Sequence, residues 1–204
     1  MTLTDKAGAE KAGEENAGTE KASPFRVRSS IDADIDAMLA IYRRHIRLGV
    51  EEGVEDSGVP EPSDLRDRRK NLQDRRLPHL VAVENGEVLG YAYVVPFRKR
   101  PAYRFSVKHS IYIRHDQRRH GVGEALMNAL IDACAASGFR RMISYIDADN
   151  AASLALHEKL GFSRAGLLPG AAYRNGRWSD TVLIERSLGH GSTTPPPPLP
   201  LSKM

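Results

Sequence analysis

The sequence predicts a mixed α/β domain built around one sheet, and three observations predict it. Segments with the residue spacing of strands and of helices alternate from about residue 25 to residue 188. The expected order is a strand, two helices, three strands, a helix, a strand, a helix and two strands, with no internal repeat. A glycine-containing turn joins a strand directly to a helix near Gly121. Together these features indicate helices packed against a single mixed sheet.

Length, charge and cysteine content exclude several functional classes. The 204 residues are enough for one domain with tails, and the formal net charge of +4 suits an anionic small ligand. Basic residues are dispersed among acidic ones, so we expect no nucleic acid partner. No apolar run approaches about 20 residues, so we expect no membrane partner. Cys134 is the single cysteine, which indicates a reducing, cytoplasmic location without a disulfide framework.

Both ends of the chain are expected to lie outside the fold. Residues 1–23 are poor in apolar side chains, contain no signal-peptide core and are predicted to be disordered. Residues 189–204 include four consecutive prolines, Pro195 to Pro198. We predict a Pro-rich disordered tail here, with a polyproline ligand as the alternative. The domain is therefore expected over residues 24–188.

The first half of the domain begins with a short strand from Phe25 to Arg28. Asp32 is the expected N-cap of a helix that ends near Leu48. The apolar residues of this helix recur at helical spacing: Ile35, Met38, Leu39, Tyr42 and Ile46. Residues 49–62 are irregular and acidic, and form either a solvated loop or a wall of a substrate site that attracts a cationic amine. A charged helix follows from Ser63 to about Asp74.

Three strands are expected next. They cover residues 80–84, 88–96 and about 104–113, and the first two are joined by the hairpin signal Asn85-Gly86. A helix from Glu124 to Ser137 then ends at Gly138, a typical C-terminal glycine. The buried face of this helix is predicted from its apolar residues, Leu126, Met127, Leu130, Ile131 and Cys134.

The remaining elements are a strand, a helix and a pair of strands. The strand covers Arg141 to Asp147, and the helix runs from its cap at Asn150 to Leu160, with Gly161 at its end. The last two strands are expected over residues 162–167 and 181–188, the second preceded by the turn Asn175-Gly176.

The turn between residues 110 and 123 has the composition of an anion site. A strand containing Ile111 and Ile113 passes into a basic turn that ends in Gly121-Val122-Gly123 and opens a helix. The first amides of a helix lack intrahelical partners and lie at the positive end of its dipole. The alternative is a turn that only opens the helix. Two nucleotide motifs are excluded: Leu126 stands where the dinucleotide fingerprint needs a glycine, and the P-loop Gly-Lys-Ser/Thr is absent.

The helix after Asn150 carries a second polar pattern. Asn150, Ser153 and His157 are spaced i, i+3 and i+7, which puts them on one face of the helix. Such a polar stripe ending in a histidine indicates either a functional face or a solvated one with a surface histidine.

Here the sequence resembles the GNAT superfamily of N-acetyltransferases. Residues 118–123, Arg-Arg-His-Gly-Val-Gly, fit its signature Gln/Arg-x-x-Gly-x-Gly/Ala, and residues 156–162 fit its later helix-to-strand element. Four further segments resemble the phosphinothricin and methionine sulfoximine acetyltransferases: residues 101–104, 109–113, 150–153 and 175–180. The resemblance covers about residues 25–188. It implies a mostly antiparallel sheet with one splayed parallel strand pair and about four flanking helices.

The resemblance also implies a site. Coenzyme A diphosphate would be bound by the backbone of Arg118, Arg119, His120, Gly121, Val122 and Gly123. The pantetheine arm would lie along Ile111, Tyr112 and Ile113, whose N–H groups would bind the thioester carbonyl. On the following helix, Asn150 and Ser153 would line the cofactor. His157 would either protonate the departing thiolate or position other groups. Tyr103 and Arg104 are the candidates for acceptor contact.

One position departs from the family pattern. The relatives usually carry Val-Glu-His-Ser before the tyrosine-containing strand, and that glutamate is regarded as the base; this chain has Lys108 there, followed by His109. An amine with a pKa of about 10 must lose a proton before it attacks. Three solutions stay open: Lys108 with a lowered pKa, His109 or a water chain, or a different substrate whose carboxylate or phosphinate pairs with Lys108.

The sequence therefore predicts an acetyl-CoA-dependent N-acetyltransferase, without a metal, that acetylates the primary amine of a small molecule by direct attack in a ternary complex. The acceptor implied by the resemblance is an amino acid analogue such as phosphinothricin or methionine sulfoximine. Protein or polyamine acetylation is an alternative acceptor assignment, and a non-catalytic acyl-CoA-binding regulator is an alternative class. A homodimer is implied by the family alone.

Overall fold

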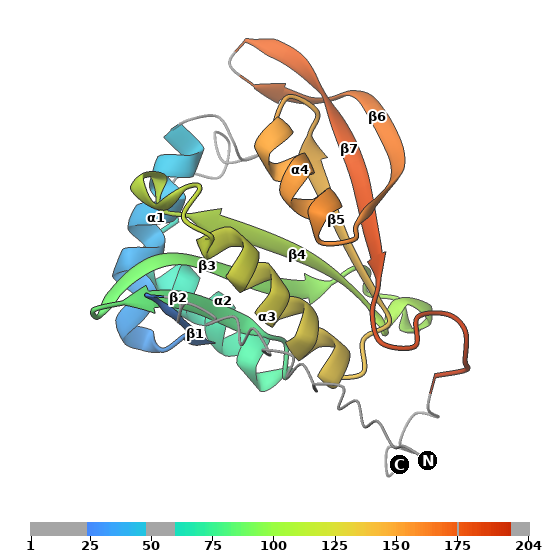
Figure 1. Cartoon of the computed structure of the whole chain (residues 1–204), viewed down its shortest axis with the longest axis horizontal. Helices are drawn as coiled ribbons and strands as arrows, with labels where there is room; N and C mark the ends of the chain where they lie inside the picture. The colour runs from blue at the N-terminus through green and yellow to red at the C-terminus, as the bar shows by residue number, and fades with distance from the viewer. Residues whose placement is uncertain (1–23, 48–59, 175, 197–204) are drawn as a thin grey trace, which may run out of the picture.

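A computed structural model describes residues 24–47, 60–174 and 176–196 (Figure 1). Its seven strands form one sheet in the order β1-β2-β3-β4-β5-β7-β6. All neighbouring strands are antiparallel except β4 and β5, which are parallel. The predicted fold class, a mixed and mostly antiparallel sheet with one parallel pair, is confirmed.

The described elements follow the predicted order. The strands are β1 (Arg26–Ser29), β2 (His79–Glu84), β3 (Glu87–Pro96), β4 (Ser106–Ile113), β5 (Arg141–Asp147), β6 (Ser163–Arg174) and β7 (Arg177–Ser187). The helices are α1 (Ile35–Arg47), α2 (Pro62–Asp74), α3 (Val122–Ala136) and α4 (Ala151–Lys159). Three 3-10 turns, η1 (Asp32–Asp34), η2 (Pro101–Tyr103) and η3 (His115–Gln117), complete the described part. Within that part, no helix has the length and apolarity to cross a membrane.

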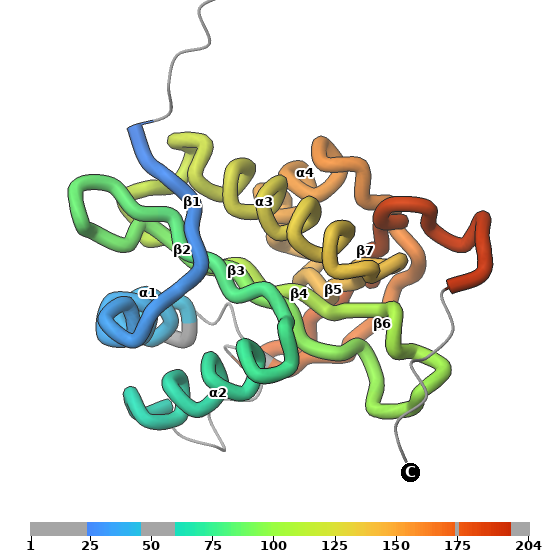
Figure 2. The backbone as a smooth tube through the Cα atoms, turned by 90° about the horizontal axis from the view of Figure 1, so that it is seen from below, coloured from blue at the N-terminus to red at the C-terminus, as the bar shows by residue number. Residues whose placement is uncertain are grey.

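The helices cover both faces of the sheet. Figure 2 shows α1 and α2 on one face and α3 and α4 on the other. The apolar face predicted for α3 is buried throughout, and so are Ile35, Met38, Leu39 and Tyr42 of α1. Burying each such side chain contributes roughly 1.5–3 kcal/mol, so the two helices hold the sheet from opposite sides.

The start of α1 differs from the prediction. Asp32 does not cap the helix, because η1 intervenes and Asp34 is the residue whose carboxylate accepts the N–H of Ile31 at 2.8 Å. Asp32 instead pairs with Arg69 of α2. Sequence alone did not distinguish the two acids, since both have the short carboxylate that a helix start favours.

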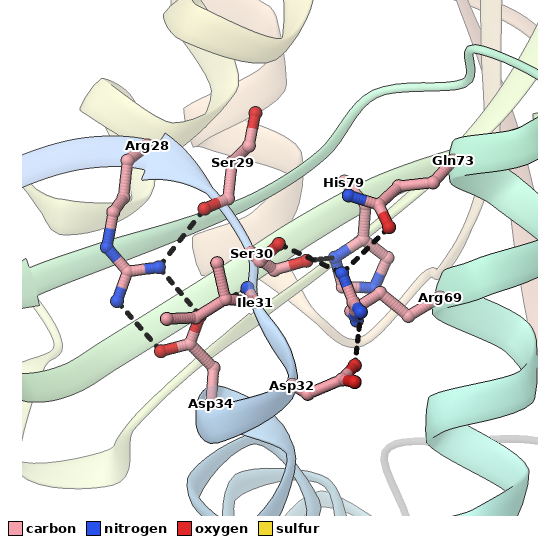
Figure 3. Close-up of polar contacts among 9 residues, drawn as sticks. All are labelled: Arg28, Ser29, Ser30, Ile31, Asp32, Asp34, Arg69, Gln73 and His79. Atoms are coloured by element: carbon pink, nitrogen blue, oxygen red, sulfur yellow. Dashed lines mark hydrogen bonds and ion pairs between the residues drawn. The ribbon is translucent and has the colours of Figure 1, made fainter.

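A polar network joins this corner to α2 and β2 (Figure 3). Arg28 donates two hydrogen bonds to Asp34, at 2.7 and 2.8 Å. Burial opposes ionisation of Asp34, but the bonds from Arg28 and Ile31 outweigh it and lower the pKa of this carboxyl. Buried Arg69 donates to the Ser30 carbonyl at 3.1 Å, and the Ser30 hydroxyl bonds Nδ1 of His79 at 2.8 Å. These bonds fix the two helices on this face of the sheet relative to β1 and β2.

The C-terminal hairpin is longer than predicted. β6 and β7 pair from Ser163↔Glu185 to Arg174↔Arg177, with register shifts between Arg164 and Gly166 and between Leu168 and Ala172. The predicted strand ended at residue 167, but a bulge accommodates Pro169 and Gly170 and pairing resumes beyond them. Residues 189–192 form turns after β7. The predictions for residues 1–23, 48–59, 197–204 and Asn175 lie outside the described residues.

Candidate active site

β4 and β5 diverge soon after they begin. Their parallel pairing covers only Ser106↔Arg141, Val107↔Met142 and Lys108↔Ile143. Beyond this point β4 stays paired with β3 up to Ile113, and β5 stays paired with β7 up to Asp147 (Figure 1). We call the region between the diverging halves of the two strands the strand wedge. It is the splayed parallel pair that the resemblance implied.

Backbone groups of β4 point into the strand wedge. Arg114 N–H donates to Leu89 O at 2.8 Å and Phe97 N–H donates to Ser106 O at 3.0 Å, so the even-numbered residues of β4 hydrogen-bond β3. The odd-numbered residues His109, Ile111 and Ile113 therefore direct their N–H and C=O groups toward β5. The wedge thus offers a row of backbone donors beside α4.

The turn before α3 leaves the first helical amides uncapped. Gly121 is the N-cap residue, with φ +80°, and no side chain hydrogen-bonds the cap. Arg119 is also left-handed, with φ +66°. Arg118, Arg119, His120 and Gly121 are exposed, while Val122 is buried and anchors the turn. Open amides, a positive helix end and two exposed guanidinium groups fit a diphosphate.

The two glycines of this turn have different roles. A Cβ on Gly121 would meet no atom within 4 Å, so its positive φ, not space, demands glycine. A Cβ on Gly123 would lie 3.3 Å from Leu156 Cδ2 and 3.7 Å from Ile113 Cγ1. Gly123 therefore lets α3 approach α4 and the end of β4, which brings the uncapped amides to the mouth of the strand wedge.

The polar residues of α4 lie together, as their spacing predicted. Asn150 caps the helix by accepting Ser153 N–H at 3.1 Å. His157 is buried, with 1% of its surface exposed, so it is not a surface histidine. Its Nδ1 lies 2.7 Å from Ser153 O, and its Nε2 lies 2.9 Å from Nε2 of buried His109 on β4. The wedge is therefore bridged on the α4 side by a histidine pair.

The protons of this pair follow from its partners. A carbonyl oxygen only accepts, so Nδ1 of His157 donates to Ser153 O and its Nε2 accepts from Nε2–H of His109. Nδ1 of His109 has no hydrogen-bond partner among the described residues, which agrees with a proton on Nε2. Burial, assisted by His157, lowers the pKa of His109 to about 3, and burial also lowers the pKa of His157. The neutral pair has no proton to donate from Nε2 of His157.

Acid is expected to destabilise the fold through its buried histidines. Burial lowers the pKa of His79 to about 4, as it lowers that of His109 to about 3. Because both values lie below the unfolded value of about 6.5, stability is complete above that pH and is lost as the pH falls toward the folded values. By pH 5 each histidine should cost on the order of 2 kcal/mol of unfolding free energy.

Urea unfolding between pH 8 and pH 5 measures this loss. His79→Gln should reduce the pH dependence, whereas replacement of exposed His120 by Gln should leave it unchanged. A free energy of unfolding that stays constant from pH 8 to pH 5 would contradict the buried, neutral state of these side chains.

Lys108 lies on the opposite face of β4 from His109. Lys108 pairs with Val95 of β3, and Ser110, the next residue on the same face of β4, pairs with Tyr93. The side chains of these four residues therefore share the face of the sheet that α1 and α2 cover. Arg68 of α2 donates to the Tyr93 hydroxyl at 3.3 Å. None of the described carboxylates pairs with Lys108 or Arg68. Lys108 of β4 and Arg68 of α2 thus lie on the same side of the sheet, near the start of the wedge.

The predicted acceptor residues precede β4. Tyr103 is 39% exposed, and its ring lies edge-on to Phe97, with centroids 5.8 Å apart. Arg104 lies over the Phe105 ring at 4.4 Å and donates to Pro101 O at 3.3 Å. Both residues lie just before β4, at the end of the wedge where β4 and β5 are still paired, which we call its closed end.

Sequence reasoning missed three residues of this site. Arg68 and Tyr93 flank the lysine face, and the Ser144 hydroxyl donates to His109 O at 3.2 Å where the wedge opens. The alternation of Tyr91 and Tyr93 in the sequence indicates a strand face lined by tyrosine rings and their hydroxyl groups, which could have pointed to Tyr93. Nothing in the sequence of α2 distinguishes Arg68 from the other basic residues of that helix. Cys134 has no role at the site: it is buried, and burial raises the pKa of its thiol to about 12.

The tyrosines of this face form a packed ladder. Tyr112 of β4 contacts Tyr91 with ring centroids 4.8 Å apart, and Tyr42 of α1 lies edge-on at 5.4 Å. Tyr112 is thus part of the core on the α1 side, and, as an even-numbered residue of β4, it directs its N–H and C=O groups toward β3, so the prediction that its N–H binds the thioester carbonyl does not fit this register. In the described part of the chain, no three His, Cys, Asp or Glu side chains are grouped as metal ligands.

Comparisons with known proteins agree with this geometry. The model of the acetyltransferase (GNAT) family matches residues 41–162. The chain is 42% identical over 171 residues to phosphinothricin N-acetyltransferase of Alcaligenes faecalis, covering 83% of this chain and 86% of the relative. It is 35% identical over 173 residues to L-methionine sulfoximine/L-methionine sulfone acetyltransferase of Pseudomonas aeruginosa, covering 83% and 98%.

A solved structure is similar over most of the chain. It is a GNAT superfamily phosphinothricin acetyltransferase from Sinorhizobium meliloti in complex with AcCoA, with a TM-score of 0.80 and 36% identity. The similarity covers 85% of this chain and 94% of that one.

Proposed function

The chain belongs to the GNAT acetyltransferase family and is an acetyl-CoA-dependent N-acyltransferase, and on this premise we propose that it acetylates the primary amine of a small amino acid analogue. The uncapped amides of the turn before α3, beside the strand wedge, are the observation that carries the proposal. The relatives are named as phosphinothricin and methionine sulfoximine acetyltransferases, and these names support the choice of acceptor.

In this proposal the chain binds acetyl-CoA at two points. The amides of Val122 and Gly123, with Arg118 and Arg119, bind the diphosphate. The N–H groups of Ile111 and Ile113 point into the wedge and bind the thioester carbonyl, where negative charge develops during attack. One fixed donor of this kind contributes on the order of 10²–10³ to the rate in comparable sites.

The reaction is a direct transfer. The neutral amine attacks the thioester carbon, the C–N bond forms, the C–S bond breaks and coenzyme A leaves with the sulfur electron pair. Asn150 and Ser153 position α4 along the wedge. We assign the histidine pair to positioning, since the neutral pair supplies no proton to the thiolate and both rings are buried between β4 and α4. Water then takes the extra proton from the nitrogen of the new amide and supplies a proton to the thiolate.

The acceptor is proposed to carry an acid group near its amine. Arg68 and Lys108 support this, because both lie on the α2 side of the wedge and lack a described carboxylate partner. A carboxylate or phosphinate would form a charge-assisted hydrogen bond with the guanidinium of Arg68. Tyr103 and Arg104 remain proposed acceptor contacts at the closed end.

An acceptor panel tests the function. With acetyl-CoA, L-phosphinothricin and L-methionine sulfoximine should release free thiol with kcat/KM at least about 100-fold above spermidine or a peptide N-terminus, a factor worth about 2.7 kcal/mol. Mass spectrometry should identify the N-acetyl product. Arg68→Gln should raise KM for these acids about tenfold without changing acetyl-CoA affinity. Replacement of exposed Arg66 on the same helix by Gln should leave KM unchanged.

Other results would identify the alternatives. Turnover of spermidine or peptides alone would make the chain a polyamine or protein acetyltransferase. Tight acetyl-CoA binding without thiol release for any amine would make it a non-catalytic regulator. A cytoplasmic location and a homodimer stay predictions, and the mass of the purified protein in solution measures the second.

A further inference from the structure

A second cavity lies away from the strand wedge. It has a volume of about 380 Å³ and lies between α1, the β2–β3 turn and the segment that follows β4. Its apolar wall is formed by Ala33, Ala37, Ala40, Ile41 and Val88. The space exists because the side chains of α1 that face the turn at Gly86 are small alanines, which do not fill the gap between helix and turn. The volume is within the range of small-molecule sites.

One end of the cavity is strongly basic. Arg44, His45, Arg114, His115 and Arg118 line it, against two acidic residues, Asp34 and Glu87. Both acids are already paired, Asp34 with Arg28 and Glu87 with Arg114. Arg114 also pairs with Asp116. None of the described carboxylates pairs with Arg44 or Arg118. Two guanidinium charges therefore face this end of the cavity without an ion-pair partner among the described residues.

The pKa of His45 is lowered in part by the same positive charges. Its Nε2–H donates to Ile113 O at 3.0 Å, which holds the ring at the cavity wall. Burial lowers the pKa of His45, and the positive charges of Arg118, Arg44 and His115 act in the same direction. The protein thus concentrates cationic groups around a partly apolar space, an arrangement that an anion would relieve.

We propose that this cavity binds a small organic carboxylate, with its acid group between Arg44 and Arg118 and its apolar body over the alanines of α1. The arginines supply charge-assisted hydrogen bonds, and the alanine wall excludes water from the body of the ligand. The proposal concerns binding alone and does not rest on the acetyl transfer proposed above.

The cavity is separate from the cofactor site in the fold. α1 lies on the face of the sheet opposite α3, as Figure 2 shows, and the uncapped amides belong to α3. Arg118 and Ile113 are shared: Arg118 opens the signature turn, Ile113 ends β4 at the wedge, and both line the cavity. Competition with coenzyme A therefore distinguishes an independent site from an extension of the cofactor site.

Fluorine NMR of the full chain tests the proposal with two probes, 4-fluorobenzoate and 4,4,4-trifluorobutyrate. At least one should bind saturably with a Kd of about 1 mM or tighter, and its neutral amide should bind at least about tenfold more weakly. Ala40→Trp should abolish binding by filling the cavity. Arg44→Gln should weaken binding about tenfold, whereas Arg66→Gln, at an exposed position of α2, should leave binding unchanged.

Three results would overturn the proposal. They are the absence of saturable binding by both probes up to about 10 mM, equal effects of the Arg44 and Arg66 variants, and full displacement of the probe by coenzyme A. Thermal unfolding of each variant and its unchanged acetyl-CoA affinity establish that the fold is intact. A failed acceptor panel leaves this outcome untouched, because no acyl transfer is measured here.

Discussion

Replacing Gly121 with valine is expected to weaken acetyl-CoA binding by about 100-fold. Gly121 has φ +80°, a conformation that costs a side-chain-bearing residue roughly 1–2 kcal/mol, more for a β-branched one. Relaxation of the turn would also misalign the amides of the first turn of α3, and each lost hydrogen bond to a charged group costs roughly 1.5–3 kcal/mol. Isothermal titration of the purified chain with acetyl-CoA measures the change.

The other end of the same helix provides a matched control. Gly138 has φ +83°, and a Cβ added there, like one added at Gly121, would meet no atom within 4 Å. Gly138→Val therefore introduces the same backbone strain and should lower the thermal stability similarly, but it should leave the dissociation constant of acetyl-CoA unchanged. Equal losses of affinity in both variants would mean that the amides of the turn do not bind the cofactor.

The second large effect concerns the proton of the acceptor amine. Without a carboxylate at position 108, the amine must arrive neutral, and only about one molecule in a thousand is neutral at pH 7 if its pKa is about 10. We therefore expect kcat/KM to rise about tenfold per pH unit from pH 7 to pH 9, without a plateau near neutrality. A plateau below pH 8 would mean that the protein supplies a base, and the water route would be wrong.

Lys108→Glu should change the shape of this profile. A carboxylate base accepts the proton during attack, so kcat/KM at pH 7 should rise about 100-fold and should converge with the unmodified protein near pH 10. Lys108→Gln removes the charge without adding a base and should keep the steep profile. Lys108→Glu also removes a positive charge that supports binding of the acceptor's acid group, so a glutamate variant that is slower at every pH would mean that this charge contributes more than an added base does.

Local pattern was sufficient to predict most of the fold. The apolar residues of α3, Leu126 to Cys134, repeat at helical spacing because a helix turns every 3.6 residues, and the same residues are buried in the structure. Asn150 was identified as a helix cap from its side-chain chemistry and position, and it accepts Ser153 N–H. The positive φ values of Gly138 and Gly161 agree with the helix ends predicted from these glycines.

Long-range contacts were beyond that reach. The partner of Asp32 is Arg69, 37 residues further along the chain, and no local signal selects it over other basic residues of α2. The bulges in β6 depend on how β7 lies beside it. Neither feature leaves a mark in the spacing of apolar residues, because each depends on which surfaces meet after the chain has folded.

The same division applies to the site. The sequence by itself determined the fold class, the turn from Arg118 to Gly123 and the unusual lysine beside His109, since each depends on residues that are neighbours in the chain. Only the tertiary structure decided that His109 and His157 meet at 2.9 Å, that Lys108 shares the opposite face of the sheet with Tyr93, and that β4 and β5 part after Lys108. Side chains alternate between the faces of a strand, so adjacent residues enter different environments, and packing of the covering helices sets what each one touches.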